Sequence, residues 1–179
     1  NRGLGVINIS NPSNPQYLGL VSNTDNYILE DLDVNSNYLA VAAHEDGTLL
    51  FDISNPSNPI FITSLEGENV WTVHFSGDYL YVGDENVLNI YEATFDNSGA
   101  ILNYNLELSV NLSNSIKDIE SGHYNNYIFV ALGSDGVVLI EYLPDSNQYV
   151  TLDLYNTSAL ANKIDFFNDT IFTQRLAVS

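Results

Sequence analysis

The sequence GTLLFDISNPSNP, from Gly47 to Pro59, occurs a second time as GLGVINISNPSNP, from Gly3 to Pro15. Its first half alternates side chains between two faces, which is the period of two of a β-strand. Its second half, Ser54 to Pro59, ends the strand because proline has no N–H to donate and restricts the residue before it. The duplication predicts a repeat protein made of strands and rigid turns.

A phrase of three short strands recurs along the chain, and its fourth copy is incomplete. The aligned first-strand positions Leu32, Val73, Ile119 and Ile164 are 41, 46 and 45 residues apart. Stretches 59–65, 101–110 and 148–154 are long enough to add a fourth, outer strand to the first three copies. The predicted strands of the phrase are 28–34, 38–43 and 48–53; 70–75, 79–82 and 87–91; 116–120, 127–132 and 137–142; and 163–166 and 170–173.

Four strands repeating every 40 to 45 residues are typical of the blades of a β-propeller. The prediction is an all-β, single-domain propeller over residues 1–179, with blades 28–66, 70–110, 116–155, and 161–179 completed by residues 1–22. In that arrangement, 3–9 would pair beside 170–173 and close the ring. The alternative is a fragment of a larger propeller, because the LAVS sequence at 176–179 resembles LAVA at 39–42 and leaves residues missing at the join.

Two motifs resemble the LVIVD repeats of bacterial and archaeal surface proteins. They are DYLYVGD, at 78–84, and FDISNPSNP, at 51–59, although the third strands that begin at Val87 and Val137 lack the second motif. The resemblance implies a β-propeller in an exported or cell-surface protein, usually as one module among several. It implies no catalytic residues.

Composition excludes several classes of partner. The chain has 4 Lys and Arg against 23 Asp and Glu, a formal charge of −19, which repels nucleic acid and anionic lipid. It has no cysteine, and no apolar run approaches the roughly 20 residues that span a bilayer. Because the sequence also has no methionine and no leader-like segment, we expect it to be part of a larger chain or assembly.

Polar residues alternate with apolar ones on the predicted innermost strands, and a propeller would bring them together at its axis. One interpretation is hydrogen bonding between blades; the other is a cation site or a pocket for a small molecule. Trp71 is either a core residue or a side chain that stacks on a ligand at the channel mouth. The candidate ligand-binding residues are Asp31, Asp33, Trp71, His74, Asp118 and Glu120.

Acidic turns between second and third strands are predicted to share one rim of the propeller. Oxygen ligands suit Ca²⁺, although no Asp-x-Asp-x-Asp-Gly loop is present and such turns are commonly only solvated. Calcium is therefore a candidate ligand rather than an expected cofactor. The candidate metal ligands are Glu45, Asp46, Asp84, Glu85 and Asp135.

No nucleophile with a positioned base is recognisable in the sequence, so the favoured function is non-enzymatic. We expect an extracellular or cell-surface interaction or structural module whose partner is a protein or a cell-surface glycan. The alternatives are a carbohydrate- or peptide-binding propeller with an acidic, calcium-binding rim, and a propeller hydrolase or lyase. An interaction module predicts contacts through the sides of the ring, and a carbohydrate- or peptide-binding module predicts a concave rim. An enzyme predicts a tight pocket with two carboxylates of different pKa.

Overall fold

The computed structural model describes residues 3–97, 99–122, 127–143, 146, 148–157, 159–169 and 173–178. Over these residues the chain forms strands and turns and no helix, so nothing in them could cross a membrane as a helix. Three four-stranded antiparallel sheets, or blades, follow one another, with a two-stranded hairpin at each end. The fold is therefore all-β, as predicted.

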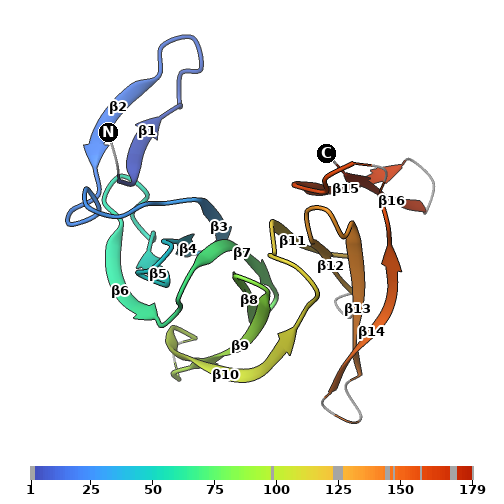
Figure 1. The fold of residues 1–179 in the computed structure, drawn as a ribbon. Helices are drawn as coiled ribbons and strands as arrows, with labels where there is room; N and C mark the ends of the chain where they lie inside the picture. Colours follow the sequence, from blue (N-terminus) through green and yellow to red (C-terminus); the bar gives the residue numbers. More distant parts are fainter. Residues whose placement is uncertain are drawn as a thin grey trace.

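Each blade uses its strands in sequence order, from the innermost to the outermost. The inner strands β3, β7, β11 and β15 line the inside of an open arc, and the outer strands β6, β10 and β14 form its outside (Figure 1). Blade 1 contains β3 (Asp31–Asn35), β4 (Tyr38–Ala42), β5 (Thr48–Asp52) and β6 (Ile60–Leu65). Blade 2 contains β7 (Val70–Ser76), β8 (Tyr79–Asp84), β9 (Val87–Phe95) and β10 (Ile101–Asn111); blade 3 contains β11 (Asp118–Ser121), β12 (Tyr127–Ala131), β13 (Val137–Leu143) and β14 (Gln148–Tyr155).

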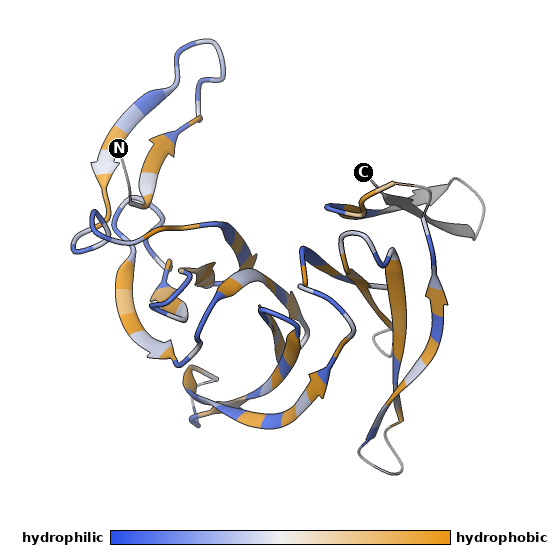
Figure 2. Ribbon diagram, in the orientation of Figure 1, coloured by the Kyte–Doolittle hydropathy of each residue, from blue (hydrophilic) through white to orange (hydrophobic). Residues whose placement is uncertain are grey.

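The hydrophobic pattern of each strand follows its place in the blade. Middle strands such as β4 and β8 are buried on both faces and are almost continuously apolar (Figure 2). The outer strands are mostly exposed and mix polar with apolar residues. The core therefore lies between adjacent blades rather than at one centre.

Each gap between neighbouring blades is filled by its own apolar cluster. Ala40 and Leu50 of blade 1 pack with Val73 and Phe75 of blade 2. Tyr81 and Ile90 of blade 2 pack in the same way with residues of blade 3. Successive blades are also joined through the backbone: His44 and Val70 exchange both N–H···O bonds, at 3.1 and 3.2 Å, and Gly133 and Ala161 do the same. Blades 1 to 3 thus form a continuous stack.

The duplicated motif folds identically in its two copies. In blade 1, Asp52 Oδ1 accepts the backbone N–H of Ser54 at 2.7 Å, and the backbone N–H of Asn58 donates to the oxygen of Asn55 at 2.9 Å. At the N-terminus, Asn8 and Asn11 make the corresponding contacts at 2.9 Å each. β1 (Gly5–Asn8) and β2 (Gln16–Leu20) therefore have the structure of a third and a fourth blade strand.

The predicted closure of the ring by hydrogen bonds is wrong for the described residues. β1 pairs only with β2, and β15 (Ile164–Asp169) pairs only with β16 (Thr173–Val178). Side chains packed between successive blades fix the rotation from one blade to the next, and the arc leaves the two end hairpins apart (Figure 1). The second strand predicted at 170–173 lies mostly outside the described residues, and the strand that is described begins at Thr173.

Two inner strands begin later than predicted. The ladder of β3 starts at Asp31 rather than residue 28, and that of β11 starts at Asp118 rather than residue 116. The preceding residues serve the blade interfaces instead: Leu29 packs on the cluster below the N-terminal hairpin, and Ile116 donates its N–H to Glu85 of blade 2 at 2.7 Å. An apolar run in the sequence indicates burial, but it does not show whether the residues pair in a strand or pack between blades.

Candidate axial site and acidic rim

At the first polar position of the inner strands, blades 1 and 3 each carry an aspartate that binds the following inner strand, whereas blade 2 has Thr72 there. Asp31 Oδ2 of blade 1 accepts the hydroxyl of Thr72 at 2.7 Å and the backbone N–H of Val73 at 3.2 Å. Asp118 of blade 3 repeats the contact, since its Oδ2 accepts the N–H of Ile164 at 2.6 Å and its Oδ1 accepts Lys163 Nζ at 2.9 Å. These aspartates each bind the backbone of the following inner strand, as the interpretation of hydrogen bonding between blades requires.

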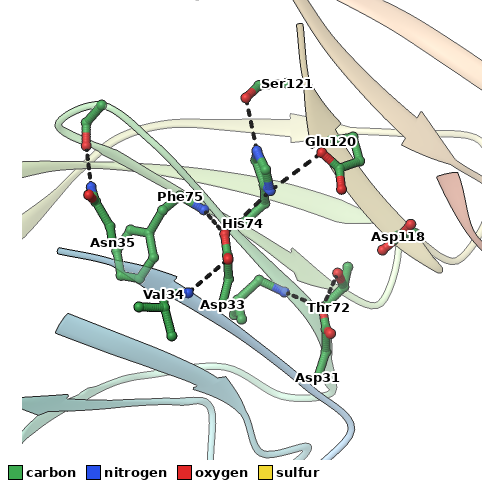
Figure 3. A network of polar contacts seen from close by, with 12 residues as sticks. Asp31, Asp33, Val34, Asn35, Thr72, His74, Phe75, Asp118, Glu120 and Ser121 are labelled. Carbon is green, nitrogen blue, oxygen red and sulfur yellow. Dashed lines mark hydrogen bonds and ion pairs between the residues drawn. The ribbon is translucent and has the colours of Figure 1, made fainter. Parts of the chain in front are cut away.

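The second polar position places a histidine between three acidic or hydroxyl groups (Figure 3). His74 Nδ1 lies 3.4 Å from Asp33 Oδ2 of blade 1 and 3.9 Å from Glu120 Oε2 of blade 3. Its Nε2 lies 2.9 Å from Ser121 Oγ. Asp33 Oδ2 also accepts the backbone N–H of Phe75 at 2.7 Å. One side chain of blade 2 therefore contacts both neighbouring blades at the axis.

Burial sets the protonation of this cluster. It lowers the pKa of His74 below the usual value, despite the opposing effect of Asp33 and Asp118, so the ring is neutral at pH 7. A neutral ring that donates Nδ1–H to Asp33 accepts the Ser121 hydroxyl at Nε2. Burial, together with the charges of Asp118, Asp165 and Asp33, raises the pKa of Glu120 to about 7. Glu120 is therefore a carboxyl group that exchanges its proton near neutrality.

Sequence reasoning missed Ser121. Its aligned positions in the other copies are Val34, Phe75 and Phe166, all apolar, so a serine there breaks the pattern of the repeat. That exception was the available signal. The sequence also predicted correctly that Asp31, Asp33, His74, Asp118 and Glu120 converge, because the alternation of each strand and the repeat period place them at one axis.

Trp71 lies outside this cluster, at the rim, where protein groups contact its ring. The His44 ring meets it edge-on, with centroids 4.4 Å apart, and Lys117 Nζ lies 4.8 Å from its centroid. Its Nε1–H is 3.4 Å from Glu85 Oε2. These contacts join blades 1, 2 and 3 in a second tie, and they occupy surfaces that a stacking ligand would use.

Three of the rim carboxylates accept hydrogen bonds from neighbouring loops. Asp84 Oδ1 accepts the backbone N–H of Asn69 at 2.7 Å, and Glu85 Oε2 accepts the Asn69 amide at 2.5 Å. Hydrogen bonds from Ser113 and Asn114 lower the pKa of Asp135. Glu45 and Asp46 instead border a depression of about 490 Å³ with Glu66 and Glu68. Within the described ranges, no three His, Asp or Glu side chains converge as metal ligands.

Comparison with solved structures defines the class of the fold. The chain is similar to Sqt1 of Saccharomyces cerevisiae, at 14% identity and a TM-score of 0.62, over 79% of this chain and 39% of that one. It is also similar to the periplasmic gluconolactonase PpgL of Pseudomonas aeruginosa, at 16% identity and a TM-score of 0.65, over 90% and 45% of the two chains. The chain is a β-propeller fold that spans less than half the length of either structure.

The repeat itself can be named more closely. A family profile for the LVIVD repeat matches residues 1–23, 29–66 and 67–90. These three segments therefore carry LVIVD repeats, which form propellers, and the resemblance drawn from the sequence is confirmed. No curated protein matched this sequence closely enough to be called a relative.

Proposed function

We propose that this chain is a non-enzymatic interaction module of an extracellular or cell-surface protein, and that it binds a protein partner through the outer strands of its blades. The observation that carries the proposal is a band of exposed apolar side chains on those strands. The band contains Tyr17, Leu18 and Leu20 of β2; Ile60, Phe61 and Ile62 of β6; Leu102 and Leu106 of β10; and Val150, Leu152, Leu154 and Tyr155 of β14.

This band differs from scattered surface residues in its regularity. Every outer strand contributes to it, whereas the middle strands keep their apolar side chains buried. Each outer strand also has one edge without a paired strand within the described residues, so a partner can add contacts from backbone as well as side chains. The charge of −19 keeps such a surface soluble and disfavours nucleic acid and anionic membranes as partners. A protein with an apolar, neutral or basic face fits it.

The axial groups support a structural role for the centre. Asp31, Asp33 and Asp118 each accept a backbone N–H of the next blade, so their carboxylates are engaged in holding the stack together. The extracellular location is proposed from the resemblance to LVIVD surface proteins.

The partner test uses the immobilised chain and surface proteins solubilised from the source cells. Replacing Phe61 and Ile62 by threonine should reduce capture of a specific protein at least tenfold, because both side chains are exposed and apolar. The matched control replaces Asp33 by asparagine at the axis and should retain capture. Equal capture by the two variants would contradict binding through the outer strands.

A second candidate is a hydrolase or lyase whose site is the axis. Two observations favour it. Ser121 as a nucleophile, His74 as a base and Asp33 as an orienting carboxylate lie in successive contact in space, and the pKa of Glu120 is raised. The similarity to a gluconolactonase, at 16% identity, concerns the fold. A screen against lactones, glycosides, polyuronates, peptides and phosphoesters decides. Turnover that Ser121→Ala and His74→Gln abolish in a folded protein would replace the interaction module by an enzyme.

A third candidate is a carbohydrate- or peptide-binding rim. The depression beside Glu45 and Asp46 is the observation that favours it. Calcium-dependent retention on a glycan or peptide array, lost in Glu45→Gln/Asp46→Asn, would support it.

A further inference from the structure

A cavity lies between blades 1 and 2, at the end of the blades opposite the acidic rim. The β3–β4, β7–β8 and β9–β10 turns meet there, whereas the candidate rim carboxylates lie on the turns at the other ends of these strands. Its volume is about 260 Å³, which is below the roughly 300–1,000 Å³ of pockets for drug-sized ligands. It therefore has room for one side chain or one small molecule. The residues that line it include Asn35, Tyr38, Asp78, Phe95, Ile101 and Tyr104.

One wall of the cavity is a departure of blade 2 from the repeat. In blade 1 the β5–β6 ladder ends at Asp52, which lies opposite Ile60, and the proline-rich turn follows. In blade 2 the β9–β10 ladder continues past the corresponding residue, Glu92, as far as Phe95 opposite Ile101. The longer hairpin brings its last residues beside blade 1, so the cavity is specific to this pair of blades.

Hydrogen bonds between the two blades hold the walls of the cavity. The hydroxyl oxygen of Tyr38, on blade 1, accepts the backbone N–H of Ile101, on blade 2, at 2.9 Å. The side-chain amide of Asn35, on blade 1, donates to the carbonyl oxygen of Gly77, on blade 2, at 2.7 Å. The cavity is therefore formed in the absence of a ligand, which reduces the ordering cost of binding.

Tyr104 brings a hydroxyl group to this cavity. Its side chain is only 7% exposed, and its ring packs on Phe75 with centroids 6.3 Å apart. No described residue forms a hydrogen bond with the hydroxyl group. Burial, together with the nearby Tyr38 and Asp78, raises the pKa of Tyr104. Because Tyr38 and Asp78 both line the cavity, the Tyr104 hydroxyl lies on its side, where a ligand can supply the partner that a buried polar group ordinarily has.

The carboxylate of Asp78 sets the charge of the ligand. Asp78 is exposed, and its side chain forms no hydrogen bond or ion pair with the described residues. Two lysines of the chain are engaged elsewhere, since Lys117 lies over Trp71 at the rim and Lys163 binds Asp118 at the axis. The chain as a whole carries a charge of −19, which also attracts cations. The complementary ligand is a cation.

We propose that this cavity binds the guanidinium group of an arginine residue of the protein partner. Tyr38, Phe95 and Tyr104 supply aromatic surface, on which a planar guanidinium stacks with a cation–π attraction. Its N–H donors suit the carboxylate of Asp78 and the oxygen of Tyr104 together. A lysine ammonium has the same charge without the planar surface. Only the source of the arginine rests on the proposed function; the guanidinium site does not.

The first measurement is a titration of the ¹⁵N-labelled chain, followed by NMR, with arginine blocked as its acetyl amide. About 150 mM salt limits the attraction from distant carboxylates to a range of about 8 Å. We expect a dissociation constant on the order of 1 mM for so small a probe, with shifts at the amides of Asn35, Gly77 and Ile101. Blocked citrulline, which has the same shape and no charge, should bind about tenfold more weakly, and blocked lysine about threefold more weakly.

Three variants test the residues of the cavity. Asp78→Asn should weaken binding of blocked arginine about tenfold, because it removes the counter-charge. Tyr104→Phe should weaken it about threefold and leave the melting temperature unchanged, since no described residue bonds to the hydroxyl. Glu107→Gln is the matched control, because it removes one charge from an exposed position of β10 outside the cavity lining; it should bind as the parent does.

The outcomes separate the site from general charge attraction. Preference for arginine over citrulline and lysine, lost in Asp78→Asn and kept in Glu107→Gln, supports the proposal. An absence of shifts at the cavity, or equal weakening by Asp78→Asn and Glu107→Gln, overturns it.

Unblocked arginine identifies the source of the guanidinium. Its carboxylate is repelled by the acidic chain, so it should bind more weakly than the blocked form. Tighter binding of unblocked arginine would overturn the assignment to a partner protein in favour of a free small molecule. Probe binding without capture of any protein would contradict the proposed function alone, whereas protein capture without probe binding would contradict only the cavity.

Discussion

The Oδ2 atom of Asp118 accepts the backbone N–H of Ile164 at 2.6 Å, although the two residues are 46 positions apart. The same carboxylate binds Lys163 Nζ through its other oxygen, and its side chain is buried. The equivalent contact between Asp31 and Val73 joins blades 1 and 2. An aspartate at one repeat position therefore links blade 1 to blade 2 and blade 3 to the C-terminal hairpin, whereas blade 2 has Thr72 at that position.

Removing this link should be costly. We expect Asp118→Ala to lower the free energy of unfolding by about 2–4 kcal/mol, because it leaves a buried N–H and a lysine without their acceptor. Asp153→Ala is the control, since Asp153 is exposed and accepts the backbone N–H of the adjacent Leu154; it should change stability by less than about 0.5 kcal/mol. Urea denaturation measures both. Equal effects would show that the axial aspartates do not hold the blades.

The raised pKa of Glu120 predicts a loss of stability as pH rises. The folded state holds the proton up to a pKa of about 7, whereas the unfolded chain releases it near 4.5. The folded state therefore binds more protons between these values, and its stability falls over that interval. His74, with its lowered pKa, has the opposite effect below 6.5.

Glu120→Gln isolates the Glu120 contribution. The amide resembles the protonated carboxyl group, so at pH 8 the variant should be more stable than the parent by about 1–2 kcal/mol, after allowance for partial exposure. At pH 4.5 the two should differ little. Thermal melting at several pH values measures the difference, and a variant that is less stable at pH 8 would show that the ionised carboxylate has a favourable partner.

Gly47 should tolerate no side chain. It has φ of 75°, and a Cβ atom there would overlap the carbonyl oxygen of Leu65, where the fourth strand ends against the turn. We expect Gly47→Ala to cost about 2–4 kcal/mol by urea denaturation. Gly77→Ala controls for backbone conformation, because Gly77 has φ of 59° and open space around it; it should cost about 1 kcal/mol. Equal losses of stability in the two variants would show that the left-handed backbone conformation, and not the overlap with Leu65, accounts for the cost.

Added salt should raise the melting temperature, because it screens the repulsion within a chain of charge −19. We expect Ca²⁺ and Mg²⁺ to raise it equally at equal ionic strength, since Asp84, Glu85 and Asp135 already accept hydrogen bonds from neighbouring loops. A saturating shift specific to Ca²⁺, lost in Glu45→Gln/Asp46→Asn, would instead demonstrate a rim site.

The inner-strand residues show which features of the axial cluster could be predicted from the sequence. The polar alternation of Asp31, Asp33, His74 and Glu120, together with the repeat period, placed them at a common axis, where the structure brings them together. Which partner each would take was not predictable. The choice of Asp33, Glu120 and Ser121 around one imidazole depends on the distance and rotation between blades.

The sequence by itself determined the repeat, the strands and the alternation of faces, because these depend on neighbours within a few residues and on one recurring motif. It also determined that residues 3–15 have the sequence of a third blade strand and its turn, since GLGVINISNPSNP copies GTLLFDISNPSNP. Only the tertiary structure decided that the N-terminal and C-terminal hairpins lie apart. The rotation between blades is set by side chains such as Val73, Phe75 and Ile119, packed against a preceding blade, and small differences in that packing accumulate from blade to blade until they fix where the last strand ends.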